Sequence, residues 1–272
     1  MPEGDTLHAA AARVGPALTG HRLVKVDGSH RTVAGGRRRL TGATVTEVVA
    51  IGKHLLIHTD RGWSVRTHLG MTGWWSIYRP GEPWRSSPGK ARVVLSTDTA
   101  VAVCFAAPTV EIGPTDQIMS TVAHLGPDLV TTAGPYPEVV TAALGHPGPT
   151  VADVLLDQRV ASGVGNVYKS EILFLEHIHP WSPPATVGED GFERLFRRAH
   201  RLLAANVRPG PRQTTGNRHR DLHWVYGRSD EPCRRCGTPI EEGRHGELQR
   251  LTTWCPSCQP MATDTSTTGS VA

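Results

Sequence analysis

Residues 233–258 read CRRCGTPIEEGRHGELQRLTTWCPSC and contain two Cys-x-x-Cys pairs separated by 18 residues. The four thiols belong to Cys233, Cys236, Cys255 and Cys258. Pairs at this spacing can place four thiolates around one tetrahedral zinc ion, with the second pair on the return strand of a hairpin. Such sites are usually structural, because four protein ligands leave no open coordination position. We therefore predict one structural Zn2+ ion per chain.

Two disulfides are the alternative arrangement of these thiols, and they would require an oxidising compartment. The first residues, Met1-Pro2-Glu3-Gly4-Asp5, are acidic and lack the apolar segment of a secretory signal. The sequence also has no run of 18 apolar residues that would predict a membrane span. We expect a cytoplasmic protein with reduced thiols and no membrane partner.

The composition is that of a globular protein with one or two packed domains. Of 272 residues, 20% are charged and 38% are hydrophobic, which excludes a largely disordered chain. The 29 basic residues exceed the 25 acidic ones, for a net charge of +4 that does not by itself identify a polyanionic partner. Only Lys25, Lys53, Lys90 and Lys169 are lysines, a skew that a GC-rich genome mainly explains. Any lysine inside a chemically suggestive motif therefore stands out.

The pattern of apolar residues changes along the chain. A short helix is expected over Thr6–Leu18, followed by a β-rich first half that suggests a sandwich or barrel. The expected strands are Arg22–Val26, Val45–Ala50, His54–Thr59, Ser64–Leu69, Arg92–Ser96 and Val101–Phe105. The last of these carries the fifth cysteine, Cys104, which we expect to be a buried and inert thiol. After the Pro- and Gly-rich stretch Gly134–Pro149, expected to be a linker, helices are predicted over Val151–Leu156, Val167–Leu175 and Phe192–Val207.

Residues Arg194–Arg220 contain eight arginines and no acidic residue. A locally basic segment of this kind is typical of a surface that meets a polyanion. A solvated helix face followed by a flexible loop would have the same charge pattern, and charge alone leaves both interpretations open.

The N-terminus offers a candidate nucleophile. Removal of Met1 before proline would leave Pro2 with a free secondary amine, which titrates near 8 against about 10.4 for lysine. Such an amine can condense with an aldehyde carbon to form an iminium ion, and Glu3 beside it is a candidate general acid or base. Many proteins begin with this dipeptide for other reasons, so its meaning depends on the rest of the chain.

Four further motifs supply that context. Residues 52–56 read GKHLL, residues 68–73 read HLGMTG, residues 158–168 read QRVASGVGNVY and residues 224–228 read WVYGR; Arg250 follows, five residues before Cys255. The glycine-bearing double turn before Tyr168 points backbone amides and Asn166 at whatever lies against the next helix, and helix N-termini favour phosphate. Together with Pro2 and Glu3, these motifs resemble the formamidopyrimidine-DNA glycosylase / endonuclease VIII family of DNA repair enzymes over residues 1 to about 260.

The resemblance implies an α+β multidomain fold with DNA in the cleft between two lobes. It divides the chain into an N-terminal catalytic β-sandwich domain (1–133), a linker (134–149), a helix–two-turn–helix DNA-binding domain (150–225), a C-terminal four-cysteine zinc finger (226–260) and a disordered tail (261–272). It also implies a partner, namely DNA that contains oxidised bases or abasic sites, and a nucleoid-associated enzyme that acts as a monomer.

The same resemblance implies roles for individual residues of the site. Pro2 would be the Schiff-base nucleophile and Glu3 its proton donor. Lys53 would serve β-elimination and contact DNA, and Arg250 would grip phosphate and support δ-elimination. Asn166 would bind phosphate, although a plain helix cap is also compatible with its position.

Departures from the family pattern bear on the substrate. Thr6 stands where many members have Glu, and Phe105–Glu111 replaces the loop that formamidopyrimidine-type members use against the orphaned base. These departures favour an endonuclease VIII-like enzyme, similar to actinobacterial members, that removes oxidised pyrimidines. Met71, after Gly70, is the candidate wedge in the vacated base stack, with a core methionine as the alternative. His124 stands where some members have an arginine that contacts DNA.

The activity implied is that of a bifunctional DNA glycosylase and AP lyase of base excision repair, which cleaves the strand by β,δ-elimination. A formamidopyrimidine/8-oxoguanine-type glycosylase and a non-catalytic binder of damaged DNA are the alternatives. A zinc-ribbon transcription or RNA-binding protein would leave the N-terminal motif without a role.

Overall fold

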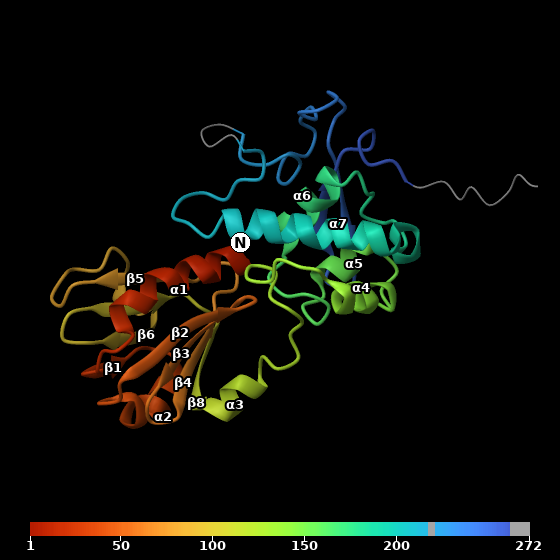
Figure 1. Ribbon diagram of the computed structural model, residues 1–272. Coiled ribbons are helices and arrows are strands. Elements are labelled where there is room, and N and C mark those ends of the chain that lie inside the picture. Colours follow the sequence, from red (N-terminus) through yellow and green to blue (C-terminus); the bar gives the residue numbers. More distant parts are fainter. Residues whose placement is uncertain (217–220, 262–272) are drawn as a thin grey trace, which may run out of the picture.

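The computed structural model describes residues 1–216 and 221–261, and Figure 1 shows two lobes with the N-terminus between them. Of the predicted tail only Met261 belongs to the described residues, and Arg218 and Arg220 of the basic segment lie outside them. No helix of the described part is long and apolar enough to cross a membrane.

The first lobe is a sandwich of two antiparallel four-stranded sheets. One sheet has the order β2-β3-β4-β8 and the other β1-β6-β7-β5. The strands are β1 (Lys25–Asp27), β2 (Val45–Ile51), β3 (His54–Thr59), β4 (Trp63–His68), β5 (Trp74–Tyr78), β6 (Ala91–Ser96), β7 (Val101–Phe105) and β8 (Thr109–Pro114). Their inward side chains form one core that includes Leu55, Val65, Trp75 and Cys104, each at most 1% exposed. The expected sandwich and the buried Cys104 are confirmed, and burial raises the pKa of that thiol.

Helix α1 (Gly4–Leu18) lies along the sandwich with Pro2 and Glu3 just before it. Leu7, Ala10, Val14 and Leu18 recur at helical spacing and are all buried in the core of the sandwich. The first residues of the chain are therefore fixed by the packing of α1, at the junction of the two lobes.

Two helices of this lobe were not predicted: α2 (Arg31–Leu40) and α3 (Thr115–Ser120). Strands β5 and β8 were also missed, and a short 3-10 helix, η1 (Pro88–Lys90), precedes β6. The expected strand over Arg22–Val26 is displaced to Lys25–Asp27, because Arg22 makes only an isolated bridge with Thr44.

The second lobe is helical, as expected. It contains α4 (Pro137–Leu144), α5 (Val151–Leu156), α6 (Asn166–Leu175) and α7 (Pro184–Ala205), which share a second core. The Pro- and Gly-rich stretch Gly134–Pro149 was expected to be a linker, but α4 occupies its middle. That expectation was wrong because Pro137 can begin a helix and because Val139, Val140 and Ala143 form a buried face.

Helices α5 and α7 carry clear start signals. Thr150 and Asp153 form a reciprocal capping box at the start of α5. Helix α7 begins at Pro184, earlier than predicted, and is interrupted at Gly188, whose φ of 66° is left-handed. From Gly191 onward its buried face matches the predicted helix.

The C-terminal module is a hairpin of β9 (Glu241–His245) and β10 (Arg250–Trp254), which packs against α6. Its small core contains Phe174 of α6 together with Val225, Cys233, Ile240 and Cys255.

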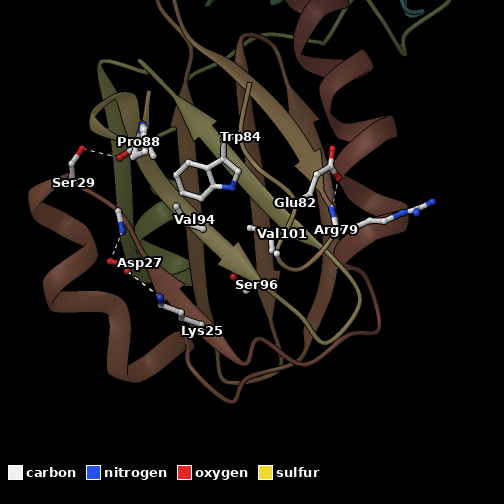
Figure 2. A pocket seen from close by; sticks show the side chains of 13 residues that line it. Lys25, Asp27, Ser29, Arg79, Glu82, Trp84, Pro88, Val94, Ser96 and Val101 are labelled. Atoms are coloured by element: carbon white, nitrogen blue, oxygen red, sulfur yellow. Dashed lines mark hydrogen bonds and ion pairs between the residues drawn. The ribbon is translucent and has the colours of Figure 1, made fainter. Parts of the chain in front are cut away.

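A hollow of about 610 Å3 lies on the outer face of the β1-β6-β7-β5 sheet. Figure 2 shows Trp84 over the sheet, with Lys25 and Asp27 on one side and Arg79 and Glu82 on the other. This hollow belongs to the sandwich alone and is separate from the lobe junction where the N-terminus lies.

Candidate functional site

The four cysteines of the hairpin module are arranged as a metal centre. Their sulfur atoms all lie within 4.8 Å of one another, and three Sγ–Sγ distances are 3.5, 3.5 and 3.9 Å. Four sulfurs at 2.3 Å from a tetrahedral zinc are about 3.8 Å apart, so the geometry fits Zn2+. Cys233, Cys236, Cys255 and Cys258 would hold this ion in a closed, structural site, as predicted.

At the junction of the lobes, Glu3 occupies the N-terminus of α6. Its fully buried carboxylate accepts hydrogen bonds from the backbone N–H groups of Gly165 (2.7 Å), Val167 (2.8 Å) and Tyr168 (3.4 Å). A negative charge is favourable there, because the helix dipole and the free N–H groups both point at it. We had expected these amides to face an external phosphate; they bind the carboxylate of Glu3 instead.

This contact depends on a glycine. A Cβ atom at Gly165 would lie 2.5 Å from Cδ of Glu3, so the double turn must have glycine where the carboxylate approaches. Beside it, the N–H of Gly4 donates to the carbonyl of Gly163 (2.9 Å). The motif 158–168 therefore anchors the N-terminal residues from the other lobe, with Gly165 lying 162 positions after Glu3 in the chain.

Lys53 enters the same region from the turn between β2 and β3. Gly52, in a left-handed conformation, donates its N–H to Asp128 (2.7 Å), and this contact fixes the turn against the start of the second lobe. Burial, with a smaller contribution from the charges of Arg250 and Arg212, lowers the pKa of Lys53 to about 8, although Glu3 opposes the shift. Lys53 can therefore exchange a proton near neutral pH, which an arginine could not easily do.

Asn166 connects the junction to the zinc finger. Its side-chain NH2 donates to the carbonyl of Leu251 in β10 (2.6 Å), and its Oδ1 accepts from Lys169 (2.7 Å). Burial raises the pKa of Tyr226, and the nearby Asn166 side chain opposes this shift; Arg250 is the first residue of β10. Lys53, Asn166, Tyr226 and Arg250 thus form a cationic and hydrogen-bonding group around the anchored Glu3.

Met71, Gly70 and His124 lie at the edge of this group. The β4–β5 turn carries Gly70 and Met71 at the sheet end where His68 pairs with His54, the neighbour of Lys53. Met71 is 67% exposed, so it is not a core methionine. His124 is exposed and close enough to His54 for its charge to lower the pKa of that imidazole.

Four residues of the junction were missed by sequence reasoning: Asp5, Lys169, Glu171 and Arg212. Glu171, fully buried on α6, accepts from the backbone N–H groups of Trp224, Val225 and Tyr226 and thereby holds the segment that carries Tyr226. A charged pair inside the otherwise apolar helix Val167–Leu175 was the available signal. Asp5 and Arg212 are partners of each other that lie 207 residues apart in the chain, and the sequence gave no such signal for them.

The burial of Lys169 leads to a prediction about how the stability of the protein depends on pH. Its fully buried amine donates to Asn166 and to Thr252 (2.6 Å), and burial, followed by the charge of Arg250, lowers its pKa to about 7. Because the unfolded lysine titrates near 10.4, the unfolded chain binds more protons between pH 7 and 10, and this group makes stability rise with pH there. The difference in unfolding free energy between the wild type and Lys169→Met should therefore increase in favour of the wild type by up to about 1.4 kcal/mol per pH unit, as measured by urea denaturation at pH 7, 8 and 9. Parallel curves would contradict the buried neutral amine.

Comparison with known proteins agrees with this arrangement. Residues 1–109 match the formamidopyrimidine-DNA glycosylase N-terminal domain, residues 125–217 its H2TH domain, and residues 230–260 the zinc finger found in FPG and IleRS. The chain is 40% identical to the probable endonuclease 8 2 of Streptomyces coelicolor, over 95% of this chain and 94% of that protein. It is also 40% identical to the DNA-(apurinic or apyrimidinic site) lyase Nei2 of Mycolicibacterium smegmatis, over 95% and 99%.

The fold is similar to that of Lactococcus lactis Fpg in a solved complex with DNA containing an abasic site, with a TM-score of 0.80, 21% identity, and 95% and 99% of the two chains covered. The domain matches, the relatives and the four-cysteine centre together place this protein: the chain belongs to the formamidopyrimidine-DNA glycosylase / endonuclease VIII family of DNA glycosylases and AP lyases.

Proposed function

We propose that this protein is a bifunctional base-excision-repair enzyme that removes oxidised bases from DNA, with pyrimidines favoured, and then cleaves the strand at the abasic site. The observation that carries the proposal is the anchoring of Glu3, the neighbour of Pro2 in the chain, on α6 and close enough to Lys53 for its charge to act on that amine. The relatives named endonuclease 8 support the endonuclease VIII type.

The chemistry begins at Pro2 once Met1 has been removed. A base inside a duplex gives no access to C1′, so the nucleotide has to be flipped out, at a cost of about a few kcal/mol. The Pro2 nitrogen then attacks C1′ and the damaged base leaves. Glu3 takes the proton that the nitrogen loses and acts as proton donor to the departing base. Cleavage of the C1′–O4′ bond then gives an iminium ion, which acidifies the C2′ proton, and elimination breaks the 3′ phosphate bond.

Lys53 is suited to the elimination step, because an amine with a pKa of about 8 can take up and release a proton near neutral pH. Arg250, which is permanently charged, would hold the departing phosphate and support the second elimination on the 5′ side. Asn166 and Tyr226 complete the phosphate-binding group, and His124 would contact the backbone next to it. These contacts position the DNA without reading its sequence.

One experiment distinguishes the proposed function from its two alternatives, a non-catalytic damage binder and a formamidopyrimidine-type glycosylase. A panel of duplexes, each with one defined oxidised pyrimidine, 8-oxoguanine, a formamidopyrimidine or an abasic site, is scored separately for base release, strand cleavage and borohydride-trapped adduct. A bifunctional enzyme releases a base and is trapped on the same duplex. Binding without release or trapping would leave a non-catalytic damage binder, and faster release of 8-oxoguanine than of pyrimidines would favour the formamidopyrimidine type.

Met71 is proposed as the wedge that fills the vacated stack. It is exposed on the β4–β5 turn, and Gly70 before it adopts a left-handed φ of 58° where a Cβ would lie 2.6 Å from Cγ of Pro108. Met71→Ala should lower base release from duplex about tenfold, since stabilising the flipped state requires about a few kcal/mol. Cleavage of a pre-formed abasic site in single-stranded DNA should stay within about twofold, and an equal loss on both substrates would argue against a wedge.

A further inference from the structure

The loop after α7 brings Arg212 back to the first residues of the chain. Its Nε and Nη2 atoms bind the two carboxylate oxygens of Asp5, at 2.8 and 2.6 Å, in a bidentate ion pair. Nη2 also donates to the hydroxyl of Thr6 (3.1 Å). Thr6, which replaces the glutamate of many family members, is thus part of the site that holds Arg212.

The ring of Tyr168 fixes the guanidinium from another side. The Cζ atom of Arg212 lies 4.8 Å from the ring centroid, and the Tyr168 hydroxyl donates to Asp5 (2.9 Å). The side chain of Arg212 is only 12% exposed, and that of Asp5 is 4% exposed. Two elements from the two lobes, α1 and α6, therefore hold the guanidinium in place with Nη1 left for another contact.

Nη1 donates to the carbonyl oxygen of Met1 (3.1 Å) and lies 3.8 Å from Oε1 of Glu3. The carbonyl carbon of Met1 is bonded to the nitrogen of Pro2. After Met1 is removed, the lone pair of that nitrogen points where this carbon was, and the carbon that it attacks will take the same place. The Met1 carbonyl therefore occupies the position of a C–O group bonded to the nucleophile.

We propose that Arg212 is a catalytic residue whose Nη1 donates a hydrogen bond to the oxygen on C1′ of the deoxyribose during formation of the iminium ion. This inference rests on the proposed function, because it requires Pro2 to be the nucleophile. The ligand is the sugar oxygen that gains negative charge, and the other contacts of Arg212 position the donor toward it.

At a pre-formed abasic site this atom is the aldehyde oxygen. The Pro2 nitrogen attacks C1′, the π pair of the C=O bond moves to oxygen, and the nitrogen proton is transferred to that oxygen through Glu3. The oxygen then takes a second proton from solvent, the C1′–O bond breaks, the oxygen leaves as water, and the nitrogen lone pair forms the C=N bond. With a damaged nucleotide, the oxygen is O4′: base loss is followed by cleavage of the C1′–O4′ bond, and O4′ takes the electron pair of that bond and a proton from solvent. Arg212 stays protonated throughout.

The test compares Arg212→Gln with the wild type in single-turnover borohydride trapping on a pre-formed abasic site. Loss of one such donor lowers a rate by about 100- to 1,000-fold, so the trapping rate should fall by about that factor. Binding to a duplex with tetrahydrofuran, which cannot form an imine, should stay within about threefold. The melting temperature should fall, because Asp5 loses its buried partner, so both assays are run well below the melting temperature of the variant.

Tyr168→Phe is the matched control, because it removes a hydroxyl that holds Asp5 and leaves the guanidinium intact. A purely structural role predicts equal losses of trapping in both variants, whereas donation to the oxygen predicts a much smaller loss in Tyr168→Phe. Trapping by Arg212→Gln within about threefold of wild type, or a matching loss of tetrahydrofuran binding, would overturn the inference. Failure of the wild type itself to be trapped would instead overturn the proposed function.

Discussion

Blocking the nitrogen of Pro2 is expected to abolish the covalent adduct with abasic-site DNA and to lower strand cleavage by at least about 1,000-fold, because only a free amine can form the Schiff base. The cleanest form of the experiment leaves every side chain in place. A chain with a removable N-terminal extension carries Pro2 as a tertiary amide; after proteolysis to Pro2, the same preparation has the free secondary amine. Trapping by borohydride should appear only after the extension is cut.

Lys53 makes this experiment necessary, because burial gives the junction a second amine that is partly neutral near pH 8. If Lys53 were the nucleophile, the extended chain would be trapped as fast as the cut one, and peptide mapping would place the sugar on Lys53. Tetrahydrofuran-DNA binding by both forms is the control for access. Equal binding with trapping only in the cut form assigns the nitrogen to Pro2.

The short motifs were readable from the sequence because each is local. The cysteine spacing predicted the metal centre, and the apolar period separated the β-rich lobe from the helical one. The roles at the junction depend instead on distant partners. The amides of the double turn were expected to meet a phosphate, and nothing local in residues 158–168 indicates that Glu3 fills that position.

Missed elements have a similar cause. Helix α2 contains two adjacent glycines and four arginines, which give no amphipathic signal, yet Val33, Gly36 and Leu40 are buried. Gly36 belongs to the packed face because a Cβ there would lie 2.1 Å from Cγ2 of Ile112 in β8. Strand β8 ends in Gly113 and Pro114, which read as a turn, and its strand conformation comes from pairing with β4. Tertiary contacts overrode local propensity in both cases.

Arg212 shows most directly why the charge of a segment does not predict what each of its residues contacts. The basic segment Arg194–Arg220 was open to two interpretations, a polyanion surface or a solvated face and loop. For Arg212 the structure supports neither, because its charge is paired with Asp5 inside the protein. Other arginines of the segment form ion pairs within the helical lobe: Arg197 with Glu193 on the same helix, and Arg198 with Glu176 at the end of α6. Net charge could not separate these cases, since each requires the partner to be known.

Loss of the zinc ion is the second change with a large expected effect. Apparent binding free energies of structural zinc in finger peptides are about 10–16 kcal/mol at pH 7, and a small four-cysteine module without its metal unfolds. The module here has few other sources of stability: its core joins Phe174 to Val225, Ile240 and two of the cysteines. Unfolding it would release Arg250 and would remove the carbonyl of Leu251 and the hydroxyl of Thr252 from Asn166 and Lys169.

Cys255→Ser should therefore reduce the zinc content from about one ion per chain to near zero, as measured by elemental analysis, and should lower strand cleavage at an abasic site by at least about 100-fold through the loss of a folded module. The sandwich has its own core and should still unfold cooperatively on heating. Leu248→Ser, at a side chain 74% exposed in the same hairpin, is the control that keeps both zinc and cleavage. A Cys255→Ser protein that cleaves at the wild-type rate without zinc would mean that the finger does not hold Arg250 for the reaction, and would leave phosphate binding to the lobe junction alone.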